Sequence, residues 1–211
     1  MEPLAPPHDC PLCPRLADFR AANRKKYPDW FNAPVPSFGP LTAKLLIVGL
    51  APGLQGANRT GRPFTGDWAG DLLYATLLKH GLARGTYDER ADDGLELVDC
   101  RIANSVRCVP PQNKPEPSEI KTCRQFLKSE LETLPNVKAL LALGKIAHDS
   151  VCDTLGLRKA THPFKHGGAY DSGKFKLISS YHCSRYNTNT GVLTTAMFEK
   201  VVAQAKKAAL G

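Results

Sequence analysis

The sequence lacks any apolar run near the roughly 18 residues that a membrane-spanning helix requires. It also lacks internal repeats and low-complexity tracts. The first ten residues, MEPLAPPHDC, contain two acidic residues and no apolar core, unlike a secretory signal. We therefore expect a protein of the cytoplasm, associated with the nucleoid only if it binds DNA, and with no membrane partner.

Nothing in the length of 211 residues calls for a second domain. The fractions of hydrophobic residues, 42%, and of charged residues, 23%, are ordinary for a soluble globular protein. We expect one domain over residues 1–211, and a monomer, since no pattern indicates an oligomer.

Acidic residues are comparatively few, 20 against 28 basic residues, so the net charge is +8. Such an excess suits a polyanionic partner such as nucleic acid, because neutralising phosphates releases counterions. A solvated basic surface explains the same numbers, and composition alone does not decide between the two.

A disulfide framework is not expected, because the seven cysteines are odd in number and no export signal accompanies them. Cys10 and Cys13 form CPLC, and Cys108 and Cys123 lie farther along the chain. Four thiolates suit zinc or a 4Fe–4S cluster, and the wide spacing favours the cluster. Four unrelated buried cysteines remain the alternative.

The other three cysteines have no such partners. Cys100 and Cys152 lie on apolar faces and are expected in the core. Cys183 follows His182, which permits a Cys–His nucleophile hypothesis, but no oxyanion motif accompanies the pair.

Strands and helices alternate along the chain. Apolar runs predict strands over 44–49, 99–108, 137–144 and 174–182, and helical periodicity predicts helices over 66–82, 118–134 (with Ser118 or a neighbour as N-cap), 145–156 and 193–210. This alternation predicts a single three-layer α/β/α domain with a mainly parallel four-stranded sheet. Ligands of such sheets bind beyond the carboxyl ends of the strands, where most of the unusual polar residues fall.

The loop GLAPGLQGANRTGRPFTGD (49–67) follows the first strand but lacks the Lys–Ser/Thr of a phosphate-binding loop and the G-x-G-x-x-G of a dinucleotide site. Its Pro52 and Gly53 favour a sharp turn with exposed amides. Each polar residue has a plain structural explanation: Asp67 as a helix N-cap, Phe64 as a core aromatic, and Asn58, Arg59 and Arg62 as a solvated loop. Together they indicate a site.

Three segments, GLAPGLQGANRTGRPFTGD, VRCVPPQNKP and SYHCSRYNTNTG, together with the four cysteines, resemble the uracil-DNA glycosylase superfamily, specifically its type 5 branch. The resemblance covers nearly the whole chain. It implies an α/β/α fold and a structural 4Fe–4S cluster on Cys10, Cys13, Cys108 and Cys123. Type 4 members carry an acidic residue directly after the first glycine of the opening motif, where this chain has Leu50 followed by Ala51.

The resemblance implies excision of a flipped base from DNA. Phe64 would stack on the base, backbone amides around Ala51 and Gly53 would bind its carbonyl oxygens, and Asn104 would read its edge. An asparagine amide suits uracil, and it suits hypoxanthine or xanthine as well.

The same resemblance suggests the chemistry. Asp67 would stabilise the positively charged sugar or orient water, His182 would donate a hydrogen bond to the departing base, and Asn113 would position water or base. No lysine lies in a Schiff-base setting, so we expect a monofunctional hydrolase of base excision repair that leaves an abasic site.

Expected DNA contacts lie near these motifs: Arg59, Arg62, Arg107, Lys114, Arg185, Tyr186 and Asn187. Two other functions remain open. A non-enzymatic nucleic-acid-binding module with a structural metal would explain the charge and the cysteines. A nucleotide hydrolase or transferase would use GLAPG as a phosphate cradle, although the missing lysine counts against it.

Overall fold

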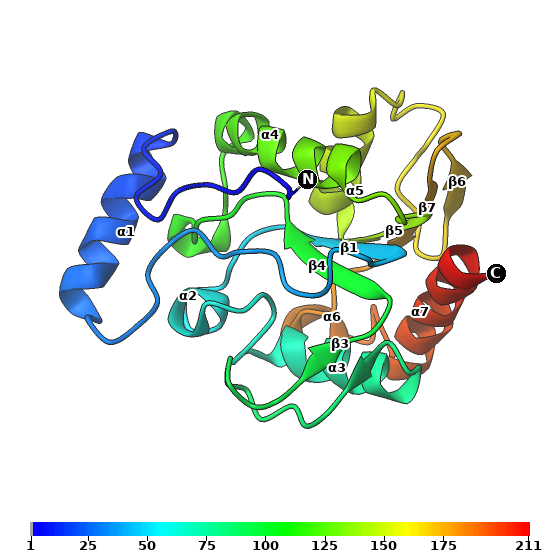
Figure 1. Ribbon diagram of the computed structural model, residues 1–211, viewed down its shortest axis with the longest axis horizontal. Coiled ribbons are helices and arrows are strands. Elements are labelled where there is room, and N and C mark those ends of the chain that lie inside the picture. Colours follow the sequence, from blue (N-terminus) through cyan, green and yellow to red (C-terminus); the bar gives the residue numbers. More distant parts are fainter. Residues whose placement is uncertain (1) are drawn as a thin grey trace.

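A central five-stranded sheet organises the molecule in the computed structural model, which describes residues 2–211 (Figure 1). Its strands run in the order β4-β1-β5-β7-β6, with bounds β1 Leu45–Gly49, β4 Cys100–Asn104, β5 Ala139–Leu143, β6 Ala169–Asp171 and β7 Lys176–Ser180. The first four in this order are parallel and β6 is antiparallel to β7. The mainly parallel sheet is confirmed, with one short edge strand, β6, beyond the four predicted.

Helices cover both faces of this sheet, which confirms the three-layer prediction (Figure 1). The flanking helices are α3 Trp68–Lys79, α4 Pro117–Thr133, α5 Lys145–Leu155 and α7 Thr195–Leu210. Leu45 and Ile47 of β1 point into the core shared with α3 and α7, whereas Leu46 and Val48 point into the core shared with α4 and α5. Because β1 is buried on both faces, its sequence LLIVG is apolar throughout.

Three further helices and a small hairpin were not predicted. They are α1 Pro14–Lys26, α2 Ala57–Thr60, α6 Arg185–Asn189, and the antiparallel pair β2 Ala83–Arg84 and β3 Glu96–Leu97. Helix α1 lies beside α4, where Arg15 forms an ion pair with Glu119 and Leu16 packs against Phe126. No helix of residues 2–211 is long and apolar enough to cross a membrane.

The N-cap of helix α4 lies two residues before Ser118, the residue that the sequence indicated. Glu116, not Ser118, is its N-cap, with Pro117 as the first helical residue. The side chains of Glu116 and Glu119 form a reciprocal capping box with the opposite backbone amides.

The order of the strands switches at β1: β4 is added on one side of it, and β5 and β7 are added on the other. The connection from β1 to β4 runs through α3 on one face, and the connection from β4 to β5 runs through α4 on the other. A crevice therefore opens beyond the carboxyl end of β1, the usual place for a ligand in such sheets.

Candidate active site

A cavity of about 370 Å³ lies at this crevice. The segments that follow β1, β4 and β7 converge there, together with the start of α3. It is lined by Leu50, Ala51, Pro52, Gly53, Ala57, Phe64, Asp67, Trp68, Ala69, Asn104, Asn113, His182, Ser184 and Arg185. The structure thus brings together every residue predicted to bind the base or to act in catalysis.

Asn104 and Phe64 form the inner wall of the cavity around Gly49. A Cβ at Gly49 would overlap Asn104 Oδ1 and would lie 2.7 Å from Phe64 Cζ, so only glycine fits between them. The Asn104 side chain is buried, and its Oδ1 has no hydrogen-bond partner. A buried polar atom without a partner is rare and costly, and here it belongs to a residue that lines a cavity that a ligand can enter.

The backbone at Phe64 is unusual as well. Its φ is 52°, in the left-handed region that non-glycine residues seldom occupy. Backbone of this kind persists only where the surrounding structure enforces it, and it is concentrated at functional sites.

Asp67 occupies two positions at once, as the N-cap of α3 and as part of the cavity wall. Its Oδ1 accepts a 3.1 Å hydrogen bond from Gly70 N, while its Oδ2 lies so close to Gly56 that a Cβ there would overlap it. Burial raises the pKa of Asp67 above its usual value, against the lowering effect of its bonds to backbone amides. The N-cap prediction is therefore confirmed, and the same residue lines the cavity.

His182 also lines the cavity, with its ring centroid 6.0 Å from that of Phe64. Burial lowers its pKa, so the imidazole is neutral near pH 7 and carries one N–H. Asn187 donates from Nδ2 to the carbonyl of His182 at 2.8 Å and so fixes the turn that carries the ring.

Cys183 points away from this chemistry. Its thiol is fully buried, contacts the carbonyl of Ala69 at 3.4 Å and is absent from the cavity lining. Burial also raises its pKa, which disfavours the thiolate. The Cys–His nucleophile hypothesis is therefore rejected, while Cys100 and Cys152 are buried as expected.

The segment between β4 and α4 brings Asn113 to the rim of the cavity. Gln112 and Asn113 both have left-handed backbones, with φ of 55° and 57°. Both side chains are exposed, which leaves Asn113 free to reach a ligand.

Trp68 was not predicted, although it lines the mouth of the cavity and is 48% exposed. Its Nε1 donates to Thr188 Oγ1 at 2.8 Å, and the Arg185 guanidinium lies 5.7 Å from its ring centre. The signal available in the sequence was a tryptophan directly after the predicted N-cap Asp67.

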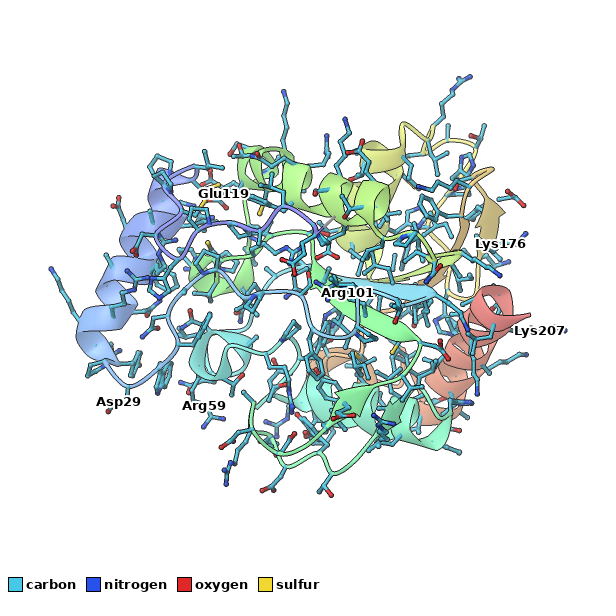
Figure 2. The ribbon with its side chains drawn as sticks, viewed as in Figure 1. Asp29, Arg59, Arg101, Glu119, Lys176 and Lys207 are labelled. Carbon is cyan, nitrogen blue, oxygen red and sulfur yellow. The ribbon has the colours of Figure 1, made fainter. Side chains whose placement is uncertain are left out.

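The predicted DNA-contacting residues divide into two groups. Arg59, Lys114, Arg185 and Tyr186 are exposed, and Figure 2 shows Arg59 on the outer side of α2. Asn187 is instead half-buried and engaged with His182.

The prediction that Arg62 and Arg107 contact DNA is wrong. Arg62 is buried and forms a double hydrogen bond with Asp93, at 2.7 and 2.8 Å. Arg107 is buried and paired with Glu130. Neither guanidinium is free to meet a phosphate, because each already neutralises a buried carboxylate.

The four cysteines of the predicted metal site line a second, buried cavity between α1 and α4 (Cys10, Cys13, Cys108 and Cys123). Within residues 2–211, no three His, Cys, Asp or Glu side chains converge closely enough to hold a single metal ion. A zinc ion binds all its thiolates at about 2.3 Å. A 4Fe–4S cluster binds each thiolate at a separate iron and so needs a wider cage. The four cysteines share one cavity, as a four-thiolate centre requires.

Comparison with known proteins is consistent with this geometry. The family model of the uracil DNA glycosylase superfamily matches residues 36–206. A type-5 uracil-DNA glycosylase of Thermus thermophilus is 45% identical, covering 95% of this chain and 94% of the relative. Type-5 enzymes of Mycobacterium leprae and Pyrobaculum aerophilum are 41% and 38% identical, covering 95% and 93% of this chain and 91% and 88% of the relatives.

Proposed function

Because the chain belongs to the uracil DNA glycosylase superfamily, we propose that it excises uracil from DNA as a monofunctional glycosylase. The observation that carries the proposal is the cavity in which Asp67, His182 and Asn104 meet, with Asn104 Oδ1 unpartnered. A uracil base flipped into this cavity supplies the N–H that this oxygen lacks.

Base recognition follows from the inner wall. Phe64 provides a flat apolar surface for stacking, and the turn from Ala51 to Gly53 offers backbone groups to the base edge. We extend the proposal to hypoxanthine and xanthine. The cavity lies in the size range of small-molecule sites, and the amide of Asn104 can pair with a carbonyl and an N–H together.

Bond cleavage separates charge across the cavity. As the bond between C1′ of the sugar and the base nitrogen breaks, the sugar becomes cationic and the base anionic. Asp67 stabilises the sugar cation or orients the water that adds to C1′. The neutral His182 donates a hydrogen bond from its N–H to the base anion. Asn113 at the rim positions water or base. The cavity lining within residues 2–211 contains no lysine, which supports hydrolysis without a covalent intermediate.

The exposed cations Arg59, Lys114 and Arg185 hold phosphates beside the flipped nucleotide, and Tyr186, 74% exposed, lies on the segment that enters the duplex. The partner is then DNA carrying uracil or another deaminated base.

We further propose a 4Fe–4S cluster on Cys10, Cys13, Cys108 and Cys123. When bound, it supplies a structural link between the N-terminal segment and α4, and it takes no part in bond cleavage. Fresh protein should be brown and contain about four iron atoms per chain. Stoichiometric zinc in protein prepared without oxygen would contradict this.

One assay separates the proposed activity from a binding module or a nucleotide hydrolase. Uracil-containing duplex is incubated with the protein, abasic sites are cleaved with alkali, and the shortened strand is measured. We expect strand shortening that is lost in Asp67→Asn and His182→Ala. Wild-type single-turnover rates in both variants would refute the assigned roles. Hypoxanthine and xanthine duplexes in the same assay test the wider range of bases.

A further inference from the structure

Arg20 of α1 is directed at the four-cysteine cavity. Its side chain is buried, with 5% of its surface exposed. Its Nη2 donates to the carbonyl of Cys10 at 2.9 Å, and its Nη1 lies 3.5 Å from Cys108 Sγ. The guanidinium thus contacts two of the four cysteines that line the cavity.

This buried cation has no carboxylate partner. Within residues 2–211 no Asp or Glu forms an ion pair with Arg20, and the neighbouring arginines of α1 hold the nearby acids: Arg15 pairs with Glu119, and Arg24 with Asp9. An unpaired buried charge is among the most costly features of a folded protein. A neutral carbonyl and a thiol sulfur, which is a weak acceptor, do not compensate it.

A metal centre on the four thiolates provides the missing negative charge. Four thiolates carry more negative charge than a 4Fe–4S core carries positive charge, so the loaded site is anionic. Arg107 already has a carboxylate partner in Glu130, and its hydrogen bond to Cys123 Sγ, at 3.3 Å, comes from its backbone amide.

We propose that Arg20 is the internal counter-cation of the four-cysteine centre, a positioning residue that retains the cluster and raises its reduction potential. The inference rests on the proposed cluster. Adding an electron makes the centre more negative, and a fixed positive charge beside a sulfur ligand favours the reduced state.

The test compares three variants as loaded proteins. Arg20→Gln keeps a hydrogen-bond donor and removes the charge, Arg20→Lys keeps the charge, and Lys25→Gln, which removes an exposed charge of the same helix, is the matched control. Two quantities are measured: the rate at which a chelator strips iron, and the midpoint potential of the one-electron couple, titrated with dithionite.

We expect Arg20→Gln to lose iron at least tenfold faster than wild type. We also expect the equilibrium constant for reduction of its cluster to fall at least tenfold, which lowers the midpoint potential by about 59 mV for a one-electron couple. Arg20→Lys should recover most of both effects, and Lys25→Gln should match wild type. Wild-type values in Arg20→Gln, or equal defects in Arg20→Gln and Arg20→Lys, would overturn the role of the charge.

Arg20→Met serves as the second neutral variant should Arg20→Gln fail to fold. Uracil excision by the wild-type protein is measured in parallel. Iron-free wild-type protein would defeat the cluster proposal and this inference together. If the wild-type protein holds a normal cluster and neither Arg20→Gln nor Arg20→Met changes iron loss or the midpoint potential, the inference alone is defeated. The proposed activity then stands.

Discussion

The carboxylate of Asp67 has a structural role as the N-cap of α3 and a proposed chemical role in the cavity. Its hydrogen bond to Gly70 N caps α3, but burial in the cavity raises its pKa. A folded-state pKa above the unfolded value means that this group adds stability at low pH, and that the contribution is lost as pH rises through the folded pKa. The ionised form that the chemistry requires is therefore the less stable one.

Asp67→Asn should separate these two roles. Asparagine caps helices as well as aspartate, so the fold should be as stable as wild type at low pH and more stable above the pKa of Asp67. Excision should fall at least 100-fold. Asp67→Ala should lose the cap, at about 0.5–2 kcal/mol. Urea unfolding from pH 4 to pH 8, with single-turnover rates, checks this. Greater stability of wild type at pH 8 would contradict the assignment.

The rate of wild-type excision should fall as the solution is acidified. The fall should begin at a higher pH than it would if the rate depended on a carboxylate with an ordinary pKa. The raised pKa means that Asp67 takes up its proton before pH 3.8 is approached, and the protonated form cannot stabilise a sugar cation. A pH profile of single-turnover excision measures this limb. His182 would not limit the rate there, because its neutral form already dominates at pH 7 and its protonated form donates as well.

For Asn104 we expect a substitution to affect excision much more than stability. Its Oδ1 is buried without a partner in the free protein, so an apolar residue of similar size should cost little stability. Asn104→Leu should therefore unfold near the wild-type urea midpoint. Uracil excision should fall by about 10–100-fold, because the base loses its edge contact. Unchanged excision would show that uracil does not use this oxygen.

At the scale of elements, the turn that carries Phe64 depends on the segment that joins α3 to β4. Arg62, next to this turn, is paired with Asp93 and lies within about 6 Å of the ring centres of Phe38, Tyr74 and Tyr87. The Tyr87 hydroxyl also donates to the carbonyl of Phe64 at 3.4 Å. The loop before β3 therefore supports the inner wall of the cavity from behind.

Arg62→Ala should leave Asp93 buried and unpaired, at a cost of about 3–5 kcal/mol. Urea unfolding measures this loss. The salt dependence of DNA binding by the folded variant should match wild type, because Arg62 does not reach phosphates. A reduced salt dependence would restore the original DNA-contact prediction.

Sequence patterns predicted the elements that obey a simple rule. Continuous apolar runs marked β1, β5 and β7, since those strands are buried on both faces. Edge strand β6, with pattern AYD, has no such run, and α1 lacks a continuous apolar face.

The candidate site was predictable where its residues follow strand ends, as Asn104 and His182 do. The burial of Arg62 and Arg107 was not, because their partners Asp93 and Glu130 lie 31 and 23 residues away. Nothing local distinguishes a buried arginine from an exposed one. The fate of a long charged side chain depends on contacts that only the folded chain creates.

At the scale of the whole molecule, the 28 lysines and arginines are divided between those in ion pairs, some of them buried, and free surface cations. Only the free cations release counterions from DNA. Arg185→Ala should reduce the slope of log K against log salt by about one and weaken binding to all sequences alike. Binding titrations at several salt concentrations measure the slope, with Arg62→Ala as the buried comparison. An unchanged slope would place Arg185 off the DNA.

The positions of the four cysteines in the sequence also determine when, during synthesis of the chain, a cluster could be assembled on them. Cys13 and Cys123 are 110 residues apart, a separation that a ribosome covers in roughly 5–20 s. Strands β1 and β4 are synthesised in that interval. A cluster on these thiols can be completed only after Cys123 has emerged. Scarcity of iron would therefore limit the protein at a step after β1 and β4 have been synthesised.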